Sequence, residues 1–339
     1  MRFLKLGPLL LTLNLITVHA APAQDGPSSK STDPFLEICA PVKNKVVPGV
    51  DLNPKSGQKG DEDCEALYYA PGGHPDYKAA YQCALRKNDR QVLTMSYANG
   101  YGVQRDVAAA LKIACTSRDG PFPDLLESAT HLRKMLSDGS TEKFDQCDDV
   151  SSTAGSKHCD AIKLSFDSAA RAQRLAAITQ AWSPADKNAF ATLEKAKNSY
   201  LDTYAKSEID RTDGASDAYA AAARSSQEDS FTETLDLLEK GKFPRASKAA
   251  FEQADKALNK AYRFTQRPRS RSAEESMWGA ISATGIRETQ RAWLRYRDAW
   301  VALAAKRYPA VSATAIKTYL TRQRTDGLEV FVPPNSPKI

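Results

Sequence analysis

The sequence lacks the short motifs that commonly mark an enzyme. It contains no G-x-S-x-G, no H-E-x-x-H, no G-x-x-x-x-G-K-[ST] and no G-x-G-x-x-G, which argues against hydrolase, zinc-protease, P-loop and dinucleotide sites. Only four histidines occur in 339 residues, and His74, His131 and His158 form no recognisable base–orienter pair. No C-x-x-C pair is present, so a metal site is not expected either. We therefore expect a protein that is not an enzyme and requires no cofactor.

Long apolar runs are also missing after the first twenty residues. No later run approaches the roughly 20 apolar residues that are needed to cross a bilayer. The 17 glycines and 18 prolines are ordinary usage, which excludes collagen and low-complexity disorder. In residues 1–20, Arg2 and Lys5 precede a short apolar segment, and the small residue Ala20 follows it. This layout predicts a signal peptide and a periplasmic or secreted mature protein.

The six cysteines all lie in the first half of the chain. An even number of cysteines in an exported protein predicts three disulfides, among fifteen possible pairings. The pair that is easiest to assign is Cys147–Cys159, because it closes a short loop. The candidates are Cys39, Cys64, Cys83, Cys115, Cys147 and Cys159.

The net charge is divided unevenly along the chain. Residues 246–329 contain 16 Lys and Arg against 8 Asp and Glu, a net charge of +8. The rest of the chain after residue 20 contains 29 against 33, a net charge of −4. Since an exported protein does not normally meet nucleic acid, this distribution favours an anionic envelope polymer as a partner of the C-terminal part.

The hydrophobic pattern predicts an all-α protein. Residues 21–61 are rich in Pro, Ser, Lys and Gly and are interpreted as a linker. From there to about residue 331, apolar residues recur at intervals of three and four, as expected for amphipathic helices. Short links between long segments predict an antiparallel bundle. The longer helices are expected near 122–137, 157–181, 184–209, 216–240, 247–264, 272–305 and 311–329.

An internal repeat occupies the first part of the helical region. Residues 76–85 match residues 106–115, with alanines at equivalent positions. Before the second copy, Gly100 ends a predicted helix, Gly102 allows a tight turn and Asp106 can cap the next helix. Repeated helix–turn–helix units of this length are typical of solenoids.

This stretch resembles the Sel-one-like (SLR) repeats, relatives of the tetratricopeptide repeat. The resemblance is carried by L-x-x-x-Y-A-N-G-Y-G-V-Q-R-D, which begins at Leu93, and by the alanines that follow. It implies a scaffold for protein interaction over residues 62–150. Two units are fewer than a free-standing solenoid needs, so disulfides and the helix near 122–137 are expected to cap them. Residues 151–245 are expected to form a helical bundle or connector.

An aromatic helix is predicted over residues 285–300. Ile286, Trp293 and Trp300 are spaced by seven residues, so they share one face with Tyr296. One interpretation is a bundle helix with this aromatic stripe in its core. The other is an aromatic and arginine surface for a partner, because these residue types concentrate binding energy. The candidate partner-binding residues are Gln290 and Arg297 beside the stripe, Arg295, and Asp298, which is expected to pair with Arg295 or Arg291.

The same region resembles the LprI-type lysozyme-inhibitor domain. The family's opening helix, D-x-x-L-N-x-x-Y, matches residues 255–262. Its central helix, Q-R-x-W-x-x-Y-R-D, matches residues 290–298, and its last helix, T-x-x-R, begins at Thr321. The resemblance covers residues 246–331 and implies an exported helical domain that inhibits lysozyme. Where family members read R-D-A-E-C with a disulfide-bonded cysteine, this chain has Trp300 and Val301, so packing by Trp300 is expected to replace the covalent link.

These observations predict an exported, non-enzymatic binding protein of the cell envelope, related to lysozyme inhibitors. The alternative is a periplasmic scaffold that binds a protein through its repeats and an anionic polymer through its basic C-terminal part. Long-range charge favours the alternative, because common lysozymes are strongly basic and would be repelled by a segment of net charge +8.

Overall fold

The fold is that of a computed structural model, which is entirely helical wherever regular secondary structure is described. The all-α prediction is therefore confirmed. The expected signal peptide, 1–20, and residues 21–33 and 51–61 of the expected linker lie outside the described residues. Those described are 34–50, 62–117, 120–212, 214, 216–268 and 278–332.

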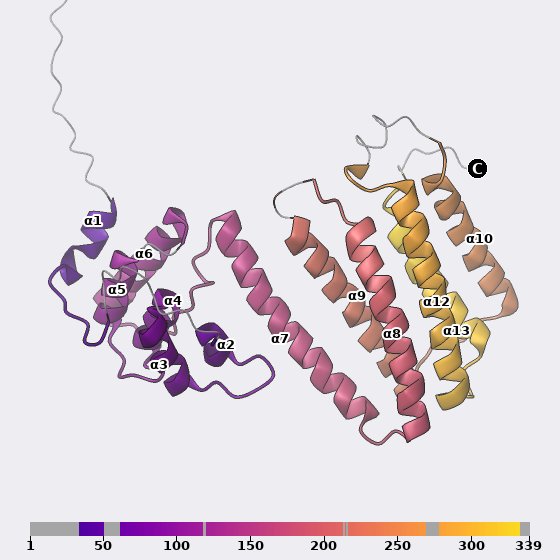
Figure 1. The fold of residues 1–339 in the computed structure, drawn as a ribbon, viewed down its shortest axis with the longest axis horizontal. Coiled ribbons are helices and arrows are strands. Elements are labelled where there is room, and N and C mark those ends of the chain that lie inside the picture. The colour runs from indigo at the N-terminus through magenta and orange to yellow at the C-terminus, as the bar shows by residue number, and fades with distance from the viewer. Residues whose placement is uncertain are drawn as a thin grey trace, which may run out of the picture.

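The N-terminal helices pack one after another around their own core (Figure 1). Leu93, Leu111 and Leu132, from three successive helices, are fully buried in this core. A short 3-10 turn, Ala40–Val42, follows the first helix. The helices are α1 (Pro34–Cys39), α2 (Cys64–Tyr69), α3 (Tyr77–Lys87), α4 (Arg90–Asn99), α5 (Val107–Thr116) and α6 (Phe122–Asp138).

The two copies of the internal repeat adopt the same local structure. The side chain of Asp76 accepts a hydrogen bond from the Ala79 amide at 2.9 Å, and Asp106 does the same with Ala109 at 2.9 Å. Each aspartate thereby starts a helix by satisfying a free backbone donor. Gly102 has a φ of 75°, and an added Cβ there would clash with the backbone carbonyl of Tyr77. The turn between the copies therefore requires glycine.

Residues 34–50 differ from the prediction, because they form structure rather than a linker. Val42 and Val47 are buried in the N-terminal core. The disulfide Cys39–Cys115 joins α1 to the helix of the second repeat copy. The composition predicts a linker because Pro and Lys are frequent here. In the structure, the burial of Val42 and Val47 and the disulfide of Cys39 fix this segment on the N-terminal core.

The predicted set of three disulfides is confirmed. Cys64 pairs with Cys83 between α2 and α3. Cys147 pairs with Cys159 and fixes the segment that leads into the next long helix. All three bonds lie in the first half of the chain, so the helices after residue 179 are held together by non-covalent contacts.

The C-terminal helices form an antiparallel bundle with a second core. Neighbours in space follow the order α7, α9, α8, α12, α13, α10, as Figure 1 shows from the magenta helix to the yellow and orange ones. The helix expected over 272–305 differs, because Ser282 caps a helix that begins only at residue 283. The helices are α7 (Thr153–Thr179), α8 (Pro184–Ser207), α9 (Ser216–Glu239), α10 (Lys248–Thr265), α12 (Ala283–Arg307) and α13 (Ala313–Glu329).

Candidate functional site

The aromatic stripe of α12 lies inside the bundle. Trp293, Tyr296 and Trp300 are all buried, and Trp300 is completely inaccessible to solvent. The Trp300 ring lies 5.1 Å from that of Phe231 on α9, measured between centroids. The Tyr296 ring stacks on Tyr200 of α8 at 5.4 Å. The stripe therefore joins α12 to two helices that precede the family-like segment, and it presents no aromatic surface to a partner.

A buried ion pair lies beside the stripe. Arg324 of α13 donates two hydrogen bonds to Glu208 at the end of α8, at 2.7 and 2.6 Å. The two side chains are 1% and 0% exposed. The Nε group of Arg324 also donates to Oε1 of Gln290 on α12 at 2.9 Å. Three helices are thus tied together by one guanidinium, whose planar fork suits a bidentate carboxylate contact.

Electrostatics in this network favour a permanently charged arginine. Burial opposes the charge of Arg324, but the hydrogen bonds and negative charge of Glu208 hold the pKa of its guanidinium above the usual value. Burial raises the pKa of Tyr200, whose ring lies beneath the guanidinium, to about 12. Arg324 and Tyr200 therefore keep their usual protonation states near neutral pH, and their role here is structural.

Gln290 lies in this network and not at the surface. Its side chain faces Arg324, so it supports the fold and is not available for direct contact with a partner. The helical spacing placed Gln290 beside the stripe correctly, but its neighbour Glu208 is distant in sequence and belongs to α8. No pattern within α12 could have indicated that carboxylate.

Arg297 and Asp298 form a local pair on α12. Arg297 donates to Asp298 at 3.0 and 2.8 Å, whereas the expected partners of Asp298 were Arg295 or Arg291. The Arg297 guanidinium lies over the Trp293 ring, 5.4 Å from its centroid, and the side chain is only 14% exposed. Arg297 therefore covers the stripe, and Asp298 is the more exposed member of the pair.

The side of α12 that faces away from the core is basic with one apolar residue. Arg291, Leu294 and Arg295 are exposed at positions one turn apart, and Leu294 is 37% exposed. In the described part of the chain, neither arginine has a hydrogen-bond partner or a carboxylate within 4.0 Å. We call these three residues the outward face of α12. Arginine is enriched at protein–protein interfaces, and apolar side chains add contact area there, so this face has features of a protein-binding surface.

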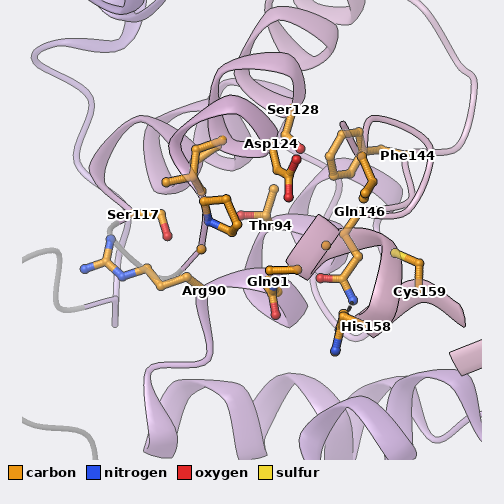
Figure 2. A pocket seen from close by; sticks show the side chains of 17 residues that line it. Arg90, Gln91, Thr94, Ser117, Asp124, Ser128, Phe144, Gln146, His158 and Cys159 are labelled. Carbon is orange, nitrogen blue, oxygen red and sulfur yellow. Dashed lines mark hydrogen bonds between the residues drawn. The ribbon is translucent and has the colours of Figure 1, made fainter. Parts of the chain in front are cut away.

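A separate cavity of about 160 Å³ lies in the N-terminal half, between α4, α6 and α7. Gln146 and His158 lie at one end of it and Arg90 at the other (Figure 2). His158 contacts Glu65 of α2 at 2.9 Å, and Gln146 hydrogen-bonds to the same carboxylate. These contacts fasten α7 to the N-terminal helices and give the polar groups at this end a structural role.

Metal ligation and membrane insertion find no support in the described residues. Among them, no group of three or more His, Cys, Asp or Glu side chains is arranged to hold a metal ion. No helix in the same part of the chain is both long and apolar enough to span a membrane.

Comparison with known proteins identifies one similarity. Residues 242–328 match the family model described as "Lysozyme inhibitor LprI". The match covers α10, α12 and α13, the helices that carry the three motifs. Searches of curated proteins and of solved structures found no match. The C-terminal helices are thus similar to a lysozyme-inhibitor family, while α8, which completes their core, lies outside the match.

Proposed function

We propose that this chain is an exported binding protein that inhibits a lysozyme-type muramidase through the outward face of α12. The observation that carries the proposal is the match of residues 242–328 to the lysozyme-inhibitor family. The three disulfides support an oxidising, extracytoplasmic compartment, where lysozyme acts.

The chemistry of the outward face fits such a target. In glycosidases of this class, two carboxyl groups of the enzyme flank the glycosidic bond that is cleaved, and one of them remains ionised. Arg291 and Arg295 have no carboxylate partner among the described residues, so they are free to pair with acidic groups of another protein. Leu294 between them supplies apolar contact. A local contact of this kind overcomes long-range repulsion when the charges meet at short distance.

We expect the variant Arg291→Glu/Arg295→Glu to bind immobilised lysozyme at least about tenfold more weakly than the parent, a loss of about 1.4 kcal/mol. The matched control is Lys256→Glu/Lys260→Glu on exposed positions of α10, which changes the net charge equally. Because both variants alter the long-range repulsion alike, a difference between them isolates the short-range contact. Equal affinity of the two variants would show that the outward face is not the binding site.

The charge distribution supports a second candidate, an envelope scaffold that holds an anionic polymer. Residues 246–329 carry a net charge of +8, and the helix–turn–helix units offer a separate surface for a protein. We expect retention on purified cell-wall polymer to fall as the Debye length shrinks from about 10 Å at 0.1 M salt to about 3 Å at 1 M. Retention that does not change with salt would exclude this candidate.

A further inference from the structure

Lys197 is a buried lysine at the junction of α7, α8 and α9. The residue is only 8% exposed, and its Nζ atom lies 4.6 Å from the centroid of the Phe231 ring. In the part of the chain that the structure describes, the ammonium has no hydrogen bond and no carboxylate within 4.0 Å. Removing an ammonium from water without a replacement partner is costly, and such groups are normally paired. The side chain therefore lacks one negatively charged neighbour.

Glu228, one of the two carboxylates whose charge acts on Lys197, is held by other residues. Glu228 contacts Arg171 at 3.2 Å and Arg224 at 3.3 Å. Burial lowers the pKa of the Lys197 ammonium, and the attraction of Glu194 and Glu228 is opposed by the repulsion of Arg224 and Arg171. The surrounding charges thus leave the desolvation of Lys197 uncompensated.

A cavity of about 190 Å³ opens beside this ammonium. Since one water occupies about 30 Å³ in the liquid, the space holds several waters or one small organic molecule. Leu175 and Phe231 form an apolar part of the wall, and Thr232 adds a hydroxyl group. The three helices lie next to one another in Figure 1, with α9 between α7 and α8. The cavity is therefore built by helices outside the family-like segment.

We propose that this cavity binds a small carboxylate, whose oxygens contact the Lys197 ammonium and whose alkyl group packs on Leu175 and Phe231. The single positive charge of the Lys197 ammonium is matched by the single negative charge of a carboxylate. A phosphate dianion fits less well, because Glu228 lines the same cavity and repels additional negative charge. A cationic ligand is disfavoured by Lys197 and Arg171 together.

Calorimetric titration of the full chain with propionate tests this proposal, with sodium chloride keeping the ionic strength constant. We expect saturable binding to the parent and to Lys195→Met, an exposed position on the same helix. Lys197→Met should bind propionate at least about tenfold more weakly. Without ligand, this variant should melt at or above the parent temperature, because the unpaired buried ammonium is gone. Equal affinity of Lys197→Met, or no saturable binding by the parent, would overturn the proposal.

A measurement on the unmodified protein covers the case in which the variant fails to fold. Propionate should raise the melting temperature of the parent above its value in chloride at equal ionic strength, because a ligand that binds the native state stabilises it. Inorganic phosphate should raise it less. A larger shift with phosphate than with propionate would contradict the assignment to a carboxylate, and no shift with either would contradict a bound anion.

Discussion

Replacing Arg324 by alanine is expected to lower the free energy of unfolding of the C-terminal helices by about 3–5 kcal/mol. The change leaves the carboxyl group of Glu208 buried without its bidentate partner, and it removes the hydrogen bond to Gln290. All four tryptophans lie at or after residue 182, so urea unfolding followed by tryptophan fluorescence reports on this core specifically.

Two variants give this prediction its controls. Arg322→Ala removes an exposed arginine two residues earlier and should change stability by no more than about 0.5 kcal/mol. The double replacement Glu208→Leu/Arg324→Met removes both charges and should lose less than Arg324→Ala alone, since no unpaired ion remains. A loss below about 1 kcal/mol for Arg324→Ala would show that the pair does not hold the helices together.

Replacing Trp300 by alanine is expected to cost about 3–5 kcal/mol, because the side chain is completely buried and its removal leaves a cavity. Trp300 contacts Phe231 of α9, so its side chain joins α12 to a helix that lies outside the matched segment. Fluorescence of the remaining tryptophans during urea unfolding measures the change. Leu294→Ala, on the exposed side of the same helix, should stay close to the parent. If Trp300→Ala unfolds like the parent, packing at this residue does not take the place of a covalent link.

The parts of the fold that depend on local sequence could be predicted. Asp76 and Asp106 precede alanine-rich segments and cap helices in the structure, and a residue of the same role, Ser183, starts α8. The sequence predicts too early a start for α12, because its helical pattern continues through residues 278–282. In the structure, Gly279 adopts a φ of 58° and the helix begins only after Ser282. Local propensity does not show where a chain turns to meet another helix.

The candidate site could be predicted only in part, because long-range pairing decides which side chains remain exposed. The spacing of Trp293, Tyr296 and Trp300 was sufficient to place them on one face. It could not show that Glu208 lies across from Arg324, 116 residues away, and draws Gln290 inward. Lys197 was missed for the same reason, since a single lysine in an amphipathic helix is normally solvated.

The most direct test of the proposed function is the rate at which lysozyme clears a peptidoglycan suspension as the purified full chain is added. The proposal predicts that the rate of clearing falls in proportion to the amount of added protein. For at least one lysozyme type, the rate should reach its minimum near equimolar amounts. The proposal also predicts that Arg291→Glu/Arg295→Glu loses this effect while Lys256→Glu/Lys260→Glu retains it. Undiminished clearing at a large excess of protein, across several lysozyme types, would contradict the central claim.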